Sequence, residues 1–266
     1  MTGTEAGAVP ATDRGGRQLA AAALAAAAVL VQMVFPFTDG GTLALTAASV
    51  LLLSGAALAH ALATRGPRAL VVLLVVAGGG GLVAEAVGVS TGVPFGRYDY
   101  TGTLGWEVLG VPALVPLAWI MMSWPALVVA RLLVPHRRAL RVVVAAWALT
   151  AWDVFLDPQM VDAGHWTWDS PHPALPGVEG IPLTNFAGWL LVSLLICGLL
   201  DRLLADAPLP LRLDAVPVAV YLWTYFSSVL AHALFFGRPP VALVGALLMG
   251  LVAWPLVARL LRERRR

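Results

Sequence analysis

Long apolar runs separated by short polar segments make up most of this chain. A helix needs about 20 apolar residues to cross the roughly 30 Å hydrocarbon core of a bilayer. Eight runs approach that length, and they cover residues 18–37, 43–63, 69–89, 107–131, 141–157, 183–204, 213–236 and 240–259. The pattern predicts an all-α fold, a polytopic transmembrane helix bundle of about eight spans, with seven as the alternative count.

Two of the connecting segments are long, at residues 90–106 and 158–182, and both are dense in Gly, Pro, aromatic and acidic residues. That composition predicts turns and re-entrant backbone rather than helix, in two structured loops on the outer side. Residues 18–260 are expected to form a single transmembrane domain. Residues 1–17 are expected to be a disordered cytoplasmic tail, and residues 261–266 a basic cytoplasmic tail.

The composition supports a membrane protein and excludes several other classes. Of the 266 residues, 59% are hydrophobic and 12% are charged, whereas a soluble domain carries about 25% charged residues. The chain has no Lys and a net charge of +2, which argues against a nucleic-acid partner. Its single Cys, Cys197, lies in an apolar run, which excludes a disulfide framework. No His or Cys pair has the spacing of a zinc site, so no metal is expected.

The arginines predict how the bundle is oriented. With the N-terminus and the C-terminus both cytoplasmic, 15 of the 17 Arg fall on the cytoplasmic side, and only Arg97 and Arg238 face outward. The opposite orientation would violate the positive-inside rule almost completely. Nine of the 15 acidic residues then fall in the outer half. We therefore expect a multi-pass protein of the cell (plasma) membrane with an acidic outer layer.

Four ionisable residues lie within the predicted spans: Glu85, Asp153, Asp157 and His232. Each costs about 2.5–3.5 kcal/mol to insert, so such residues mark functional sites by default. At about 1.5 Å per residue, Glu85 and Asp157 lie roughly 24 Å, and Asp153 roughly 18 Å, from the cytoplasmic ends of their predicted helices. All four therefore converge on the outer half of the bilayer. A lone intramembrane His is more often a packing residue than a ligand, and both interpretations of His232 stay open.

Asp153 and Asp157 are four residues apart and therefore project from one helix face. Two carboxylates in a low-dielectric site cannot both ionise cheaply, so one is expected to stay protonated near neutral pH. This is the condition for a general acid beside a carboxylate. Pro158 disfavours helical geometry at Asp157 and predicts that the helix ends there. The alternative is a structural role, as a helix cap or as partners of Arg97 or Arg238.

Tryptophan is concentrated near the same acids. Trp106, Trp152, Trp166 and Trp168 cluster at the predicted outer boundary, with Trp189 just inside it. An interfacial aromatic belt accounts for each of them individually. Their concentration beside the acids also suits an apolar pocket, or aromatic faces that stabilise a cation.

Three blocks of the sequence carry a family resemblance. They are EAVGVSTGVPFGRYDYTGTLGWEVLGVPALVPLAWIMM from Glu85 to Met122, then AWDVFLDPQMVDAGHWTWD, then GIPLTNFAGW. In this order they closely resemble the integral-membrane carotenoid hydratase family, of the bisanhydrobacterioruberin hydratase or ψ-end carotenoid 1,2-hydratase type. Many members are labelled only "carotenoid biosynthesis protein". The resemblance covers about residues 70–255.

The resemblance implies a carotenoid hydratase of the hydro-lyase class that uses no organic cofactor. Such an enzyme adds water across the terminal C1=C2 double bond of an acyclic, ψ-end carotenoid. The chemistry needs an acid that protonates C2, an anion or π face beside the tertiary carbocation at C1, and one admitted water.

The acids found above suit those roles. We assign proton donation to Asp153 or Asp157, and the orientation of water to the other carboxylate or to Glu85. Candidates for contact with the substrate or for support of the acids are Tyr98, Asp99, Tyr100, Trp152, Trp166, Trp168, Asn185 and His232. The expected partners are the membrane, a lipid-soluble carotenoid that arrives laterally from it, and other enzymes of the carotenoid pathway.

Two other functions stay open at this point. Acidic DxxxD-type motifs can hold Mg²⁺ and a diphosphate in a prenyltransferase, but diphosphate capture favours several Arg or Lys near the acids. Only Arg97 and Arg238 are on that side. A lipid or proton transporter could use the intramembrane acids as a relay, although the chain has no obvious internal repeat.

Overall fold

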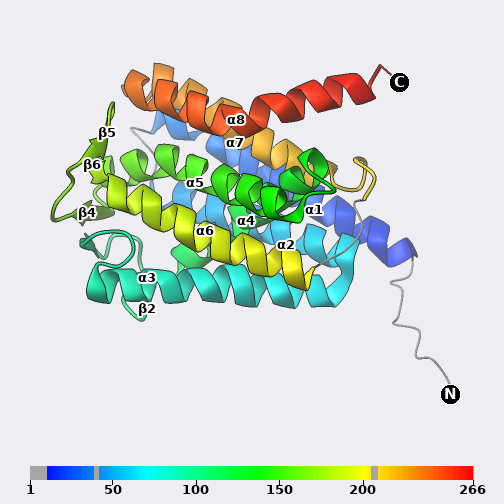
Figure 1. Cartoon of the computed structure of the whole chain (residues 1–266), viewed down its shortest axis with the longest axis horizontal. Coiled ribbons are helices and arrows are strands. Elements are labelled where there is room, and N and C mark those ends of the chain that lie inside the picture. The colour runs from blue at the N-terminus through cyan, green and yellow to red at the C-terminus, as the bar shows by residue number, and fades with distance from the viewer. Residues whose placement is uncertain (1–10, 39–41, 205–208, 266) are drawn as a thin grey trace.

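The computed structural model describes residues 11–38, 42–204 and 209–265. Its long helices are α1 (Ala11–Gln32), α2 (Leu43–Leu73), α3 (Gly80–Thr91), α4 (Leu114–Leu133), α5 (Arg138–Asp162), α6 (Leu183–Leu203), α7 (Ala215–Leu234) and α8 (Pro239–Glu263). A short 3₁₀ helix, η1 (Phe35–Phe37), follows α1, and a π-helical segment, η2 (Leu74–Gly79), joins α2 to α3. The helices form one bundle, with the start of α1 and the end of α8 at the same end (Figure 1).

The number of membrane passes depends on one kink. Seven of the described helices are long and apolar enough to cross a membrane, and one of these, Leu43–Thr91, has 49 residues. At about 1.5 Å per residue, a straight helix would place Val50 and Glu85 roughly 50 Å apart, yet both line one cavity. The reversal occurs at Gly66, whose φ of 79° suits glycine. This helix therefore makes two antiparallel passes, and the described helices make eight in total (Figure 1).

The fourth predicted span begins later than expected. Residues 107–113 do not join α4, because β2 (Glu107–Val108) and β3 (Val111–Pro112) form an antiparallel hairpin. Its two turn residues, Leu109 and Gly110, have φ values of 56° and 76°, which a helix cannot contain. Val111 and Pro112 are buried while Leu109 is 73% exposed, so this segment is a surface hairpin rather than the start of a membrane crossing.

The prediction that a helix ends at Asp157 is wrong. α5 continues through Pro158 for four further residues to Asp162, so Asp157 lies inside the helix. A proline inside a helix removes one hydrogen bond, and membrane helices tolerate this because neighbouring groups satisfy the freed backbone. The two aspartates consequently keep their common helical face.

Both predicted tails are shorter in the structure. α1 begins at Ala11, so residues 11–17 are helical and only residues 1–10 of the predicted tail lie outside the described residues. α8 extends to Glu263, so residues 261–263 are helical as well. Extending a helix that has already nucleated costs little, and its packed part supplies the nucleus.

The two long loops pair with each other at one end of the bundle, here called the strand end (Figure 1). β1 (Tyr98–Tyr100) from the first loop runs antiparallel to β4 (Trp166–Trp168) from the second. β5 (Ala174–Leu175) and β6 (Val178–Pro182) form a further hairpin. The sequence correctly excluded helix from most of both loops, but it did not predict these strands.

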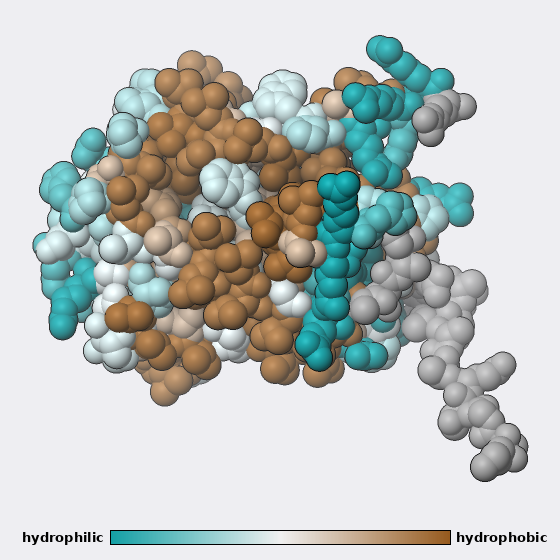
Figure 2. Space-filling model, in the orientation of Figure 1, coloured by the Kyte–Doolittle hydropathy of each residue, from teal (hydrophilic) through white to brown (hydrophobic). Residues whose placement is uncertain are grey.

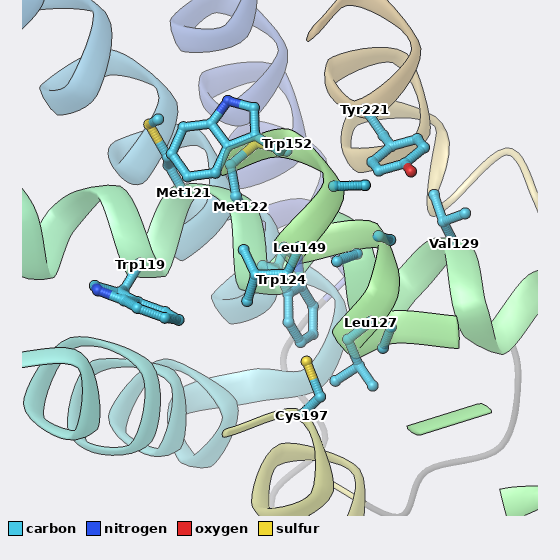
Figure 3. Packing of buried hydrophobic residues seen from close by; sticks show 14 of the residues in the cluster. Trp119, Met121, Met122, Trp124, Leu127, Val129, Leu149, Trp152, Cys197 and Tyr221 are labelled. Carbon is cyan, nitrogen blue, oxygen red and sulfur yellow. The ribbon is translucent and has the colours of Figure 1, made fainter. Parts of the chain in front are cut away.

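α4 is the centre of the bundle. Every residue from Trp119 to Leu132 is buried. Figure 3 shows its side chains among those of neighbouring helices, with Leu149 from α5, Cys197 from α6 and Tyr221 from α7. On the face of the molecule that Figure 2 shows, apolar residues cover the middle and hydrophilic residues lie toward both ends. This is the surface of a multi-pass membrane protein.

A buried ionic cluster stabilises the end opposite the strands. Asp201 on α6 is 1% exposed and accepts two hydrogen bonds of 2.8 Å from Arg141. Arg131 on α4, also buried, lies 3.4 Å from the same carboxylate. These contacts join α4, α5 and α6 at that end.

Replacing Asp201 with Asn is expected to lower the free energy of unfolding by about 3–5 kcal/mol, since the change removes the buried negative charge that Arg131 and Arg141 share. Thermal unfolding in detergent measures the loss. Glu263→Gln is the matched control, because Glu263 pairs with Arg259 on a half-exposed helix face and should cost less than about 1 kcal/mol. Equal stability of the two variants would contradict the structural role of Asp201.

Candidate active site

A small cavity at the strand end brings the predicted acids together. Its volume is about 80 Å³, and we call it the acid pocket. Its polar wall includes Glu85 from α3, Asp157 from α5 and Asn185 from α6. Its aromatic wall consists of Phe95, Tyr98, Tyr100, Trp119, Trp166, Trp168 and Trp189. Residues from the whole middle of the chain thus meet around one space.

Asp153 and Asp157 form a hydrogen-bonded unit with Asn185. The Asn185 side-chain amide donates to Oδ2 of Asp153 at 3.0 Å and also to Oδ2 of Asp157. The indole of Trp166 donates to Oδ1 of Asp157 at 3.2 Å. The two carboxyl groups also lie close enough to interact directly. A shared proton would relieve the repulsion between two neighbouring carboxylates in such a site.

The two aspartates differ in their access to the cavity. Asp157 lines the acid pocket, whereas Asp153 is fully buried and lies outside its wall. Oδ1 of Asp153 has no hydrogen-bond partner among the described residues. Only Asp157 of the pair can therefore touch a molecule in the pocket, and Asp153 can act on such a molecule through Asp157 and Asn185.

Glu85 is held by three donors. Oε2 accepts hydrogen bonds from the hydroxyl groups of Tyr98 at 2.5 Å and Tyr100 at 3.1 Å, and Oε1 accepts one from the indole of Trp119 at 3.1 Å. Three hydrogen bonds of this kind favour the ionised form of a carboxylate, whereas burial disfavours it. Glu85 therefore differs from the Asp153–Asp157 pair, where acceptors face each other.

The strand β1 positions the two tyrosines. The pKa values of Tyr98 and Tyr100 lie well above the usual value for tyrosine. Burial is the larger cause and the neighbouring Glu85 carboxylate the second, so both phenols keep their protons. Because side chains alternate along a strand, Tyr98 and Tyr100 face the pocket while Asp99 between them is exposed. The predicted candidate Asp99 thus lies outside the site.

Aromatic rings close the remaining sides of the pocket. Trp119 and Trp189 stack with their ring centres 4.1 Å apart and their planes 12° from parallel. Trp168 packs against Tyr98 and donates its indole N–H to the backbone carbonyl of Phe95. Most of the predicted tryptophans therefore belong to a pocket, whereas Trp106 is 78% exposed, as expected for an interfacial belt.

Trp119 was not among the predicted site residues. One signal for it was present four residues before Glu85, in the run of glycines that ends at Gly81. A Cβ atom on Gly81 would lie 2.5 Å from Cγ of Trp119, so only glycine lets the indole approach this helix and reach Glu85. The spacing of four places Gly81 and Glu85 on the same face of α3.

Two predicted site residues lie at a different cavity. Trp152 and His232 line a second, larger space of about 510 Å³ that adjoins the acid pocket. Trp152 still approaches the pocket indirectly, since its ring packs edge-on against Trp189. Within the described ranges, no three His, Cys, Asp or Glu side chains are placed to hold a metal ion.

Comparison with known proteins decides the family. The family described as carotenoid biosynthesis protein matches residues 46–252, which include every residue of the acid pocket. The chain belongs to this family. The prediction from the three sequence blocks is thereby confirmed.

One curated relative of this carotenoid biosynthesis protein is named bisanhydrobacterioruberin hydratase and comes from Haloarcula japonica. The two are 31% identical over an alignment of 175 positions, which covers 61% of this chain and 57% of the relative. The chain therefore matches a little over half of the relative's length. No solved structure matches the chain.

Proposed function

We propose that this protein is a hydratase that adds water across the terminal C1=C2 double bond of an acyclic carotenoid. The observation that carries the proposal is the presence of two kinds of acid around one pocket. Asp153 and Asp157 form a pair of carboxyl groups that can share one proton, and Glu85 is a carboxylate that accepts hydrogen bonds from three donors. The family and the name of the relative support a carotenoid substrate. The apolar helices favour one that arrives from the membrane.

In the first step, the Asp153–Asp157 unit supplies the proton. Asp157 is the member that lines the pocket, so it protonates C2 of the alkene, and the π electrons form the new C–H bond. The positive charge that results lies on the tertiary carbon C1. Asn185, which donates to both aspartates, holds Asp157 in place, and the hydrogen bonds from Asn185 and Trp166 stabilise the carboxylate that remains after proton transfer.

Glu85 and the aromatic wall stabilise the cation. Fixed negative charge and electron-rich ring faces in a site without bulk water act strongly on a developing positive charge. Glu85 provides the charge, and the stacked Trp119 and Trp189 provide faces close to it. The pocket is arranged for the carbocation rather than for the neutral alkene, as catalysis requires.

In the second step, water attacks C1 and its oxygen forms the new C–O bond. Glu85 accepts the proton that the water loses, which leaves a tertiary alcohol. The balance is one alkene and one water to one alcohol, and no oxidant or reductant is needed. Transfer of the proton from Glu85 back to the aspartate pair, through water, restores the starting state.

The prenyltransferase alternative gains no support from the pocket. Its described wall contains no Arg, and the chain has no Lys, so no cation is in place to bind a diphosphate. The transporter alternative gains no support from His232, which lines the second cavity rather than joining the acids in the acid pocket.

Expression in cells that accumulate lycopene or another acyclic carotenoid tests the proposal. We expect a new carotenoid heavier by one water, detected by chromatography with mass spectrometry. Cells that make the same carotenoid and carry the Asp157→Asn variant are the control, and they should contain the unmodified carotenoid alone. Absence of any hydrated product across several acyclic carotenoids would reject the hydratase.

A further inference from the structure

The acid pocket is too small for a whole carotenoid. Its volume is about 80 Å³, where a cavity needs roughly 10–15 Å³ by the same measure to hold one water. Only the reacting end group of a long isoprenoid therefore fits beside Asp157. The rest of the chain must lie elsewhere in the protein or in the lipid.

The second cavity continues from the acid pocket. Its volume of about 510 Å³ falls within the range of small-molecule sites, roughly 300–1,000 Å³. The two cavities share a stretch of wall made by Thr46, Val50, Met121, Leu156 and Met160. A chain that leaves the acid pocket past these residues enters the second cavity directly.

The far side of the second cavity is a seam between α1–η1 and α7. The described side chains that meet there include Phe37 with Phe235, edge to face at 6.3 Å, and Gln32, which accepts a 2.7 Å hydrogen bond from Trp223. Phe37 is 79% exposed, and Met33 and Leu230 on the same rim are also exposed. An apolar rim at the level of the membrane helices suits entry from lipid.

Two buried polar atoms in the wall have no partner. Nδ1 of His232 and Oγ of Ser49 make no hydrogen bond with any described residue, and the two residues are 1% and 6% exposed. Both residues line the second cavity. A buried polar group without a partner is costly, and in ligand sites such groups fix the orientation of a mostly apolar ligand. A hydroxyl group in the cavity would be a hydrogen-bond partner for an atom of this kind.

We infer that the second cavity binds the chain of an acyclic polyene whose end reacts in the acid pocket, and that His232 and Ser49 hydrogen-bond a hydroxyl group on that chain. The inference rests on the proposed hydratase function. It places the reaction after an earlier hydration or hydroxylation, which must supply the oxygen. The second cavity thus binds an oxygenated polyene more tightly than a pure hydrocarbon such as lycopene, which makes no such hydrogen bond.

Two alanines on α7 provide a matched steric test. Ala231 lines the second cavity, whereas Ala233 is exposed on another face of the same helix. Ala231→Phe is expected to lower hydration of the polyene, and the amount of polyene bound to the purified protein, at least 10-fold. Ala233→Phe should leave both at the wild-type level. Ser228→Leu, a smaller enlargement of the same wall, repeats the test if Ala231→Phe does not accumulate in membranes.

The two readouts separate the possible failures. If Ala231→Phe binds and hydrates the polyene as Ala233→Phe does, the second cavity is not the chain site, while the hydratase function stands. If the wild type binds the polyene and Ala231→Phe does not, but no variant forms a hydrated product, the chain site stands and the hydratase function fails.

His232→Phe tests the hydroxyl contact. Phenylalanine keeps a ring against Phe155 and Phe236, which pack on His232, but it offers no hydrogen bond. We expect the dissociation constant to rise about 10-fold for a monohydroxylated acyclic carotenoid and to stay unchanged for lycopene. An equal effect on both ligands, as expected if His232 binds only water, would overturn the hydroxyl assignment, and so would no effect on either.

Discussion

Asp157→Asn is expected to lower kcat for carotenoid hydration by about 10²–10⁴-fold, the usual contribution of a positioned general acid. The amide has nearly the size of the carboxyl group but carries no proton that it can transfer to an alkene. KM should change little, because Asp157 is one short side chain in a wall that is otherwise largely apolar. Product formation in membranes, normalised to the amount of protein, measures the effect.

Asp162→Asn is the control for this variant. Asp162 ends the same helix, is 60% exposed, pairs with Arg238 and does not line the acid pocket, so its replacement makes the same chemical change outside the site. It should retain wild-type activity. Wild-type activity in Asp157→Asn would remove this residue from the mechanism, and an equal loss in both variants would point to damage of the fold instead.

The membrane architecture could be predicted because its physical cause is local. A pass through lipid requires a continuous apolar run, and the sequence shows each run directly. The acids Glu85, Asp153 and Asp157 stood out for the same reason, since an ionisable residue in such a run is costly. Their convergence at one depth followed from counting residues along helices.

The contacts between distant segments could not be predicted in this way. β1 pairs with β4 across more than sixty residues of sequence, and no single-sequence pattern specifies that register. The pairing decides which side chains reach the pocket, so Tyr98 and Asp99 could not be separated beforehand. The contact of Trp119 with Glu85 depends likewise on how α3 packs against α4.

The error at Pro158 has a different origin. The rule that a residue before proline avoids helical geometry expresses a local steric preference. In α5, burial of Met160 and contacts with the strand-end segments hold the helix together beyond the proline. Tertiary packing therefore overrides the local preference, and this keeps Asp157 on the helical face that also carries Asp153.

Glu85→Gln is expected to lower kcat by about 10²–10³-fold, comparable to removing one preorganised electrostatic group from an active site. The change removes the negative charge that we assign to stabilisation of the carbocation, and it removes the acceptor for the proton of the attacking water. Glutamine has the same length, so it can still accept the indole hydrogen bond of Trp119 through its carbonyl oxygen. Binding of the polyene should therefore persist while turnover is lost.

Glu107→Gln makes the matched change on β2, where the side chain is exposed and lies outside the acid pocket, and it should leave kcat unchanged. Visible absorption of the purified protein reports bound polyene, and mass spectrometry reports the alcohol. Since the charge acts on a cation that exists only during the reaction, kcat should fall without a matching rise in KM. A rise in KM with kcat preserved would instead make Glu85 a substrate-binding group and would reject its role beside the carbocation.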